Sequence, residues 1–201
     1  DYSQAAFLAV LGCVIGGITV TGLNPDSQQG DKVILDILKR CGGKFKPVEG
    51  GLHFDRSLLK ATEIDLADCP DLGPILFTLG CFCSGETVIR NAGRLRLKES
   101  DRIEAMQTEL RKMGARIEVD GDTVHIQGVA LHAPNAPLSG HNDHRIVMAL
   151  AVAAIASGLP ALLCGAEAVD KSWPAFWSVL RGLGAKVELN TDKQEEFDIK
   201  A

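Results

Sequence analysis

"LRKMGARIEV" at residues 110–119 has two near copies in the same chain, "LKRCGGKFKP" at 38–47 and "LRGLGAKVEL" at 180–189. Each copy has the pattern of an amphipathic helix, a glycine that ends the helix, and a short strand of alternating polar and apolar residues. The spacing between copies is about 70 residues, which is typical of a repeated supersecondary unit. The glycines that align are Gly42, Gly114 and Gly184.

A second set of glycines has the same spacing and supports the repeat. Gly17, Gly85 and Gly158 each follow an apolar helical segment and precede a short run with strand character. Two separate landmarks with one period predict three α/β units within a single domain over 1–201. The expected boundaries are about 1–60, 61–128 and 129–190, with a frayed polar tail at 191–201.

Two helical segments are apolar on nearly every side: "AAFLAVLGCVIGG" at 5–17 and "RIVMALAVAAIAS" at 145–157. A helix of this kind is stable only when protein surrounds it. We therefore expect the apolar helices inside the domain and mixed sheets outside.

Composition and charge exclude several classes of protein. The chain has 46% hydrophobic and 23% charged residues and a net charge of −5, with no basic stretch that would favour nucleic acid. The apolar run near the start is too short to span a bilayer. The six cysteines form no CxxC pair and mostly lie among apolar residues, so we expect buried thiols and a cytoplasmic location. They are Cys13, Cys41, Cys69, Cys81, Cys83 and Cys164.

"LKESDRIEAM" at 97–106 places charges of both signs at the start of a predicted helix. Ser100 is the expected N-cap, with Asp101 and Arg102 in the first turn. A cation at a helix N-terminus loses up to about 1 kcal/mol unless an anion compensates it. Neighbouring carboxylates, Glu99 among them, are one explanation for this arrangement.

A similar arrangement occurs in "HNDHRIVMAL" at 141–150. Asn142 or Asp143 is expected to cap a helix whose first turn holds His144 and Arg145. Taken singly, Asp143 is explained as a cap and His144 as a satisfied, partly buried histidine.

In "VDKSWPAFWSVL" at 169–180, Ser172 is the expected cap and Lys171 comes immediately before it. Alone, Lys171 is explained as a solvated lysine. Together, four cations at helix starts predict a site for phosphate or carboxylate, because helix N-termini attract anions. These cations are Lys98, Arg102, Arg145 and Lys171.

Two carboxylates have both a structural and a chemical interpretation. Asp71, in "CPDLGP", is by itself a plausible helix cap. Glu99 is either a surface ion-pair partner of little energetic value or, if enclosed in the anion site, a proton-transfer group.

Four segments resemble the C-terminal domain of the 5-enolpyruvylshikimate-3-phosphate synthase family: "DYSQAAF", "RLRLKESDRIEAM", "HNDHRIVMA" and "VDKSWPAFW". They occur in the family's order over essentially the whole chain. The resemblance implies three βαβαββ-like units around a pseudo-threefold axis, with helices inside and mixed sheets outside.

The resemblance also implies a reaction. The enolpyruvyl group of phosphoenolpyruvate would pass to the 5-hydroxyl of shikimate 3-phosphate, with release of phosphate and no metal or organic cofactor. Arg102, Arg145 and Lys171 would bind phosphoenolpyruvate, and Glu99 would transfer protons at its methylene carbon. Asp71 would hold the attacking hydroxyl.

By the same resemblance, Lys98 would lie on the shikimate 3-phosphate side, and Asp143 and His144 would line the site. The family's other, N-terminal domain supplies further catalytic and binding groups that are absent from these 201 residues. We therefore expect this chain alone to be inactive and its partners to be the two substrates and that domain.

Two alternatives stay open. A UDP-N-acetylglucosamine enolpyruvyl transferase domain would share the architecture and the enolpyruvyl donor, but the Lys-Glu-Ser-Asp-Arg and Asn-Asp-His-Arg motifs argue against it. A non-catalytic scaffold domain would also keep the repeat, although it would be free to lose the charged residues that this chain retains.

Overall fold

The computed structural model describes residues 1–190 and 196–200. The first unit contains α1 (Tyr2–Ile15), β1 (Ile18–Thr21), the 3-10 helix η1 (Gly30–Val33), α2 (Ile34–Arg40), β2 (Lys44–Val48) and β3 (Gly51–Asp55). The second contains β4 (Glu63–Asp65), η2 (Pro70–Leu72), α3 (Gly73–Phe82), β5 (Glu86–Arg90), η3 (Ala92–Leu97), α4 (Arg102–Lys112), β6 (Arg116–Asp120) and β7 (Thr123–Gln127). The third contains β8 (Leu138–Ser139), α5 (His144–Ser157), β9 (Ala161–Cys164), η4 (Ala166–Lys171), α6 (Phe176–Gly182), β10 (Lys186–Asn190) and β11 (Glu196–Lys200).

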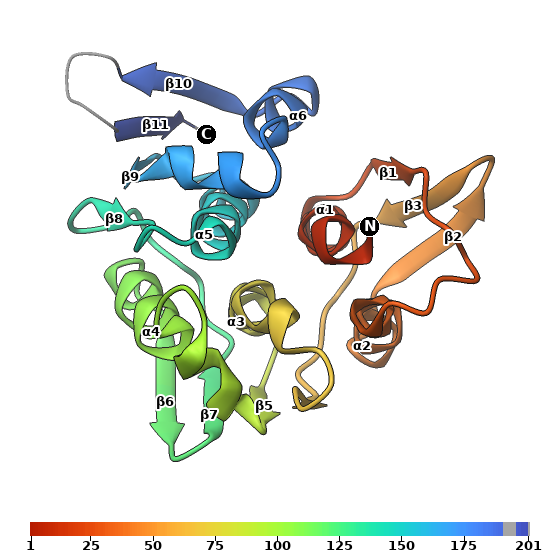
Figure 1. The fold of residues 1–201 in the computed structure, drawn as a ribbon, viewed down its shortest axis with the longest axis horizontal. Coiled ribbons are helices and arrows are strands. Elements are labelled where there is room, and N and C mark those ends of the chain that lie inside the picture. Colours follow the sequence, from red (N-terminus) through yellow and green to blue (C-terminus); the bar gives the residue numbers. More distant parts are fainter. Residues whose placement is uncertain (191–195, 201) are drawn as a thin grey trace.

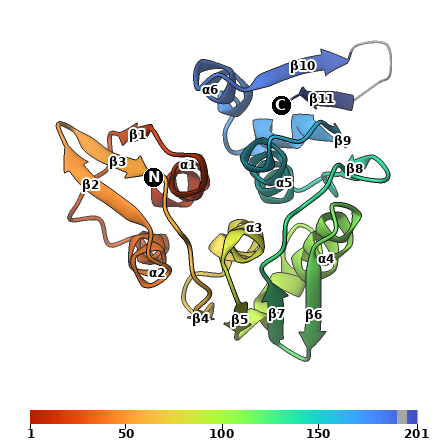
Figure 2. The same ribbon diagram turned by 180° about the vertical axis from the view of Figure 1, so that it is seen from behind.

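The three helices α1, α3 and α5 form the centre of the molecule. They pack against one another and are seen nearly end-on in Figure 1, with the sheets arranged around them. Figure 2 shows the same arrangement from behind. Most residues of each central helix are buried, which confirms the expectation drawn from their apolar sequences. None of the helices in the described residues has the length and apolar character that a membrane crossing requires.

The cysteines belong to this interior, as predicted. Cys13, Cys41, Cys69, Cys81 and Cys83 are buried, and Cys164 is partly buried. Burial raises the pKa of the Cys81 thiol to about 12, so this group stays protonated and acts as a small apolar side chain.

The three sheets follow one topology with one difference. The second has the strand order β4-β5-β7-β6 and the third β8-β9-β11-β10, and in each the first strand runs parallel to the next. The first sheet has the order β1-β3-β2, without a counterpart of β4 or β8 among the described residues. Within the described ranges, the first unit therefore has one strand fewer than the other two.

A groove lies where the repeat would place that strand. Its lining comes from α1, from β1 and from the third unit, and its volume is about 260 Å³. The lining includes Leu8 of α1, Thr19 and Thr21 of β1, and Trp173 and Val179 of the third unit. In the second unit, the corresponding strand β4 lies beside the preceding unit. A hydrogen bond of 2.7 Å from Arg40 of α2 to the Glu63 carbonyl of β4 shows this contact. The groove thus has the position of a missing edge strand.

The prediction of a frayed tail was wrong for residues 196–200. They form β11, which pairs antiparallel with both β10 and β9 and completes the third sheet. The remaining tail positions, 191–195 and 201, lie outside the described residues. The charged residues of "EFDIK" led to the prediction of a frayed tail, although they alternate with apolar residues as in a strand with one face toward solvent.

The repeat glycines have the backbone conformation that the sequence pattern required. All six have positive φ: Gly17 (75°), Gly42 (83°), Gly85 (99°), Gly114 (86°), Gly158 (65°) and Gly184 (95°). Residues that carry a Cβ are strained in this region, so Gly42, Gly114, Gly158 and Gly184 end their helices at low cost. The helices α1 and α3 end earlier, at Ile15 and Phe82, so Gly17 and Gly85 lie in the connections to the next strands.

We expect Gly184→Ala to destabilise the chain by about 1 kcal/mol, because alanine is strained at positive φ. Gly182→Ala is the matched control, since Gly182 lies two residues earlier in a helix without positive φ. A Cβ at either position would meet no atom within 4 Å. Gly182→Ala should be neutral or stabilising by up to about 0.5 kcal/mol. Urea unfolding midpoints measure both, and equal effects would contradict the conformational explanation.

Candidate active site

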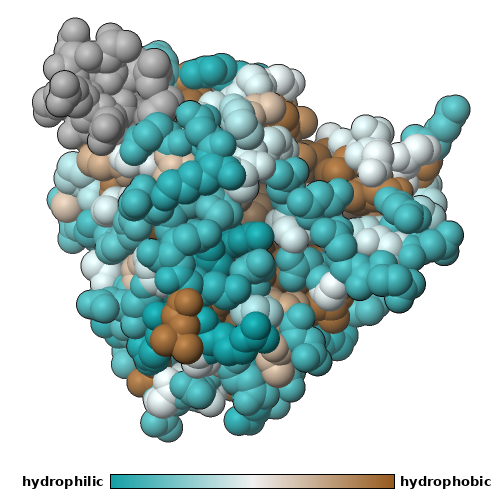
Figure 3. All heavy atoms as spheres, in the orientation of Figure 1, coloured by the Kyte–Doolittle hydropathy of each residue, from teal (hydrophilic) through white to brown (hydrophobic). Residues whose placement is uncertain are grey.

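The predicted charged residues gather where the N-terminal ends of α4 and α5 approach η2. Asp71 lies in η2, Lys98 directly follows η3, Arg102 is the first residue of α4 and His144 is the first residue of α5. Figure 3 shows that the face in view is mainly hydrophilic, with hydrophobic residues in isolated patches. Helix N-termini carry partial positive charge, so their convergence favours anions.

A buried ion pair lies at the base of this cluster. Arg102 is 1% exposed and Asp143 is 0% exposed. The Arg102 Nε donates to Asp143 Oδ2 at 2.8 Å, and Nη2 donates to Oδ1 at 3.2 Å. Ser100, which sequence reasoning treated only as a cap, donates its hydroxyl to Asp143 Oδ2 at 3.0 Å. These bonds join α4 to α5.

The ion pair sets the protonation states of both partners. Burial acts to raise the pKa of Asp143, but the hydrogen bond and charge of Arg102 hold it below its ordinary value. Burial acts to lower the pKa of Arg102, but the hydrogen bond to Asp143 together with the negative charges of Asp143, Glu99 and Asp71 raises that pKa above its ordinary value. Both groups are therefore charged at neutral pH.

Asp71 faces three cations at the rim of the cluster. Its Oδ1 lies 3.0 Å from Lys98 Nζ and 3.2 Å from Arg102 Nη1, and its Oδ2 lies 3.4 Å from Arg145 Nη2. Burial acts to raise the Asp71 pKa, and the Lys98 hydrogen bond with the charges of Arg145, Lys98 and Arg102 lowers it. The carboxylate therefore acts as a shared counterion.

Glu99 and His144 form the other side of the cluster. Glu99 Oε2 accepts a bond from Arg102 Nη2 at 2.5 Å and lies 3.7 Å from His144 Nδ1. That nitrogen is buried and has no hydrogen-bond partner. Burial lowers the pKa of His144, so the ring is neutral at pH 7 and can either donate or accept one hydrogen bond at Nδ1.

Lys171 reaches the cluster through a neighbour. Its Nζ donates to the Asn142 carbonyl at 2.5 Å and to Asn142 Oδ1 at 2.7 Å. Asn142 precedes Asp143, so Lys171 is tied to the peptide segment that enters α5. Sequence reasoning considered Asn142 only as a cap, although its place within "NDHR" marked it as part of the site.

Several predicted helix starts were wrong. Asp101, not Ser100, caps α4, because its side chain accepts from the N–H groups of Ile103 and Glu104. α6 begins at Phe176 after Ala175, so Ser172 does not cap it and Lys171 instead ends η4.

Two further cap assignments are settled by the structure. Asp143, rather than Asn142, caps α5 by accepting from the Arg145 N–H. Asp71 is not a cap, since Leu72 precedes α3. Only Arg102 and Arg145 of the four predicted cations therefore lie in the first turn of an α-helix.

One group of side chains has metal-ligand spacing. Donor atoms of Glu99, Asp143 and His144 lie within 4.8 Å of one another. Both Asp143 oxygens already accept from Arg102, however, and this guanidinium would repel a second cation. The cluster fits an anion or a proton-transfer site better than a metal.

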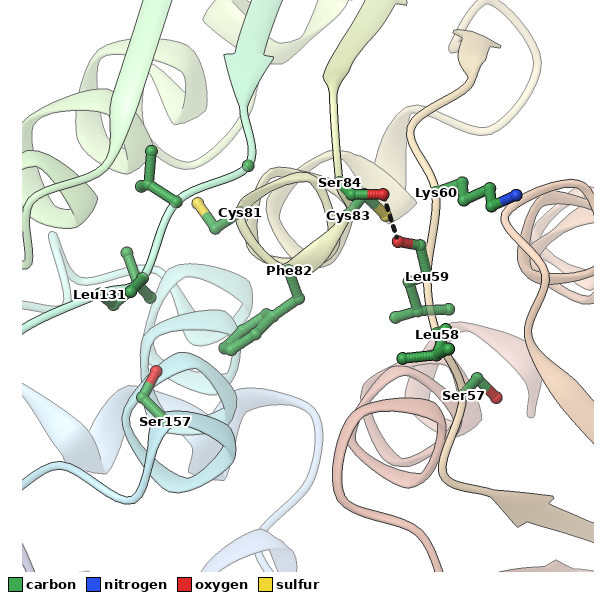
Figure 4. Close-up of a pocket in the computed structure, with 13 residues that line it drawn as sticks. Ser57, Leu58, Leu59, Lys60, Cys81, Phe82, Cys83, Ser84, Leu131 and Ser157 are labelled. Atoms are coloured by element: carbon green, nitrogen blue, oxygen red, sulfur yellow. Dashed lines mark hydrogen bonds between the residues drawn. The ribbon is translucent and has the colours of Figure 1, made fainter.

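A separate cavity of about 650 Å³ lies at the opposite ends of the central helices (Figure 4). Its lining includes Leu58, Cys81, Phe82 and Ser157, and Ser84 donates to the Leu59 carbonyl across one side. Helix C-termini carry partial negative charge and this lining is largely apolar, so the cavity does not suit an anionic substrate.

The sequence matches the family model described as EPSP synthase (3-phosphoshikimate 1-carboxyvinyltransferase) over residues 1–180. A Clostridium acetobutylicum protein named 3-phosphoshikimate 1-carboxyvinyltransferase is 44% identical over 187 residues, covering 93% of this chain and 43% of that protein. A Methanocaldococcus jannaschii protein of the same name is 40% identical over 191 residues, covering 94% and 44%. The chain thus spans less than half the length of these relatives.

Solved structures agree with the repeated α/β architecture. A structure of EPSP synthase from Acinetobacter baumannii has a TM-score of 0.75 and 28% identity, covering 90% of this chain and 45% of that one. The enolpyruvyl transferase NikO from Streptomyces tendae has a TM-score of 0.70 and 20% identity, covering 92% and 43%. The second likeness concerns the fold alone.

We expect Asp143→Ala to destabilise the chain by about 3–5 kcal/mol, because it leaves the Arg102 guanidinium buried without its partner. Glu63→Ala is the control, since the Glu63–Arg90 ion pair is exposed, with side-chain exposures of 60% and 53%. This control should have a much smaller effect. Denaturant unfolding measures both, and similar losses would show that the buried pair has no special role.

The stability difference between the wild type and Asp143→Asn should depend on pH. The folded-state pKa of Asp143 lies below the ordinary value of 3.8. The charged Asp143 carboxylate therefore stabilises the fold at pH values above the ordinary pKa of 3.8. This contribution is lost as the pH falls through the folded-state pKa. We expect the difference in unfolding free energy to narrow between about pH 5 and about pH 2. A difference that does not change with pH would contradict this linkage.

Proposed function

Because the chain belongs to the EPSP synthase family, we propose that it forms one half of an enzyme that transfers the enolpyruvyl group of phosphoenolpyruvate to shikimate 3-phosphate. Residues 1–201 would form a single domain of that enzyme, and the rest of the active site would come from a second domain. The observation that carries the proposal is the cluster in which Asp71 and Glu99 each contact a cation that the family motifs assign to substrate binding.

The arrangement supports the binding of anions. Lys98, Arg102 and Arg145 surround Asp71, which is 37% exposed at its side chain and therefore accessible from solvent. A phosphate or carboxylate that entered here would replace Asp71 as partner of these cations. Arginine favours such ligands because its planar guanidinium donates two parallel hydrogen bonds. We assign Arg102, Arg145 and Lys171 to phosphoenolpyruvate and Lys98 to the shikimate 3-phosphate side.

The same geometry supports a division of proton transfer. The 5-hydroxyl of shikimate 3-phosphate would attack C2 of phosphoenolpyruvate while its methylene carbon takes a proton, which gives a tetrahedral intermediate. Loss of a methyl proton and of phosphate then completes the transfer. Asp71 would hold the attacking hydroxyl and help remove its proton, and Glu99 would serve the methylene carbon.

Asp143 and His144 would act at the edge of this chemistry. Asp143 holds the Arg102 guanidinium in place through two hydrogen bonds. The unpartnered Nδ1 of His144 lies 3.7 Å from Glu99 Oε2. From this position the ring can contact a bound substrate or orient the Glu99 carboxylate.

The first sheet supports the participation of more polypeptide. The groove beside β1 has the position of the strand that β4 and β8 provide in the other units. We propose that a strand from outside residues 1–201 pairs with β1 in parallel and joins the second domain to this one. The alternative UDP-N-acetylglucosamine transferase finds no support, since the matched family model is that of EPSP synthase.

The test is a chimera in which this chain replaces the matched 43% of the Clostridium acetobutylicum relative. We expect the chimera to release phosphate from phosphoenolpyruvate only when shikimate 3-phosphate is present. Glu99→Gln should lower kcat by about 100-fold or more, as loss of a proton-transfer group does. Residues 1–201 alone should release none.

The outcomes separate the hypotheses. A folded chimera that binds neither substrate would favour the scaffold alternative. Phosphate release by the isolated chain would show that it contains a complete active site. The proposal that a second domain supplies the rest of the site would then be wrong.

A further inference from the structure

Glu109 is a buried carboxylate outside the cluster that binds substrate. Its side chain is 2% exposed and lies on α4. Oε2 accepts from Lys112 Nζ at 2.7 Å and from the Ser139 N–H at 2.9 Å, and Oε1 lies 3.0 Å from His141 Nε2. A carboxyl group this deeply buried is found where hydrogen-bond and ion-pair partners satisfy it.

Two of these partners belong to the segment that leads into α5. Ser139 ends β8, and His141 begins a turn in which both His141 (φ 49°) and Asn142 (φ 53°) have left-handed backbone conformations. Two consecutive residues with side chains in this region are strained and persist only where their surroundings hold them. Glu109 supplies such a restraint on one side of the turn.

The other side of the turn faces the proposed site. Asn142 presents its carbonyl and its Oδ1 to Lys171 Nζ, and the next residue is Asp143, the partner of Arg102. Asp143 accepts hydrogen bonds from Arg102 and Ser100, and its own N–H donates to the Gly140 carbonyl, so its position does not depend on Lys171. The Lys171 ammonium has polar contacts only with Asn142 among the described hydrogen bonds and ion pairs. The position of its charge therefore depends on the turn.

We propose that Glu109, acting through His141 and the left-handed turn, is a positioning residue that sets the place of the Lys171 ammonium. This inference rests on the proposed function, in which Lys171 binds phosphoenolpyruvate. It predicts that a change at Glu109 weakens substrate binding more than it slows the chemistry of Asp71 and Glu99, which lie on other elements.

The experiment uses the chimera described above with Glu109→Gln. The amide oxygen of glutamine can still accept from the Ser139 N–H. Its NH₂ group, which is a donor, replaces the carboxylate oxygen that faces His141 Nε2. We expect KM for phosphoenolpyruvate to rise by roughly tenfold while kcat changes by less than about threefold, the pattern of lost ground-state binding. Glu104→Gln is the matched control, because Glu104 is an exposed residue of the same helix, and should leave both constants unchanged.

A second variant protects the test against misfolding. His141→Asn removes the contact with Glu109 but suits a left-handed conformation better than most residues, and leaves the Ser139 and Lys112 bonds in place. The same rise in KM is expected, with a smaller magnitude. Hydrogen exchange measured by mass spectrometry should increase in peptides over 137–145 and around Lys171, with no change elsewhere for either variant.

The results distinguish the inference from the function on which it rests. An inactive wild-type chimera would refute the proposed function, and the exchange pattern would still test the restraint. A Glu109→Gln enzyme with unchanged KM and lowered kcat, or with exchange raised throughout the chain, would indicate general destabilisation and overturn the positioning role. Unchanged kinetics in both variants would overturn it as well.

Discussion

The pair of Arg102 and Asp143 is the contact on which the site depends. Arg102 begins α4, where the helix dipole opposes a cation, and its side chain is buried, where a lone charge is costly. Asp143 offsets both penalties with two hydrogen bonds and at the same time caps α5. One carboxylate therefore fixes the starts of two helices relative to each other, and this also positions the charged side chains at those helix starts.

This pair also explains how opposite charges share the site. Asp143 is committed to Arg102, so Asp71 and Glu99 at the rim are the carboxylates that a ligand can reach, with side-chain exposures of 37% and 47%. Asp71 balances the charges of Lys98, Arg102 and Arg145, which keeps these cations close together. In the proposed enzyme, an incoming anion would exchange with Asp71, and the displaced carboxylate would then be free to accept a proton.

Much of this organisation was readable from the sequence because the repeat imposes it. Apolar helices with no polar face predicted the centre, and glycines such as Gly114 and Gly184 predicted the helix ends, since few other residues adopt positive φ. Sequence reasoning misplaced the start of α6 and missed β11. Ser172 has cap chemistry but lies in a turn after η4, and β11 depends on pairing with strands distant in sequence. The connection of Glu109 to the site carried no local signal, because Ser139 and His141 lie about 30 residues further along the chain.

The unequal units suggest why the site lies where it does. The cluster is built from η2 and α4 of the second unit and from α5 and η4 of the third, whose sheets are both complete with four strands. Among the described hydrogen bonds, the first unit reaches this region at its margin, where Gln4 donates to the Ser172 carbonyl at 2.9 Å. Its helix α1 also packs against η2. It instead presents the open edge of β1, and an unpaired edge favours the addition of a strand. In the proposed enzyme, two units would thus hold the reacting groups while the third provides the attachment to the second domain, so that this attachment need not distort the Arg102–Asp143 pair.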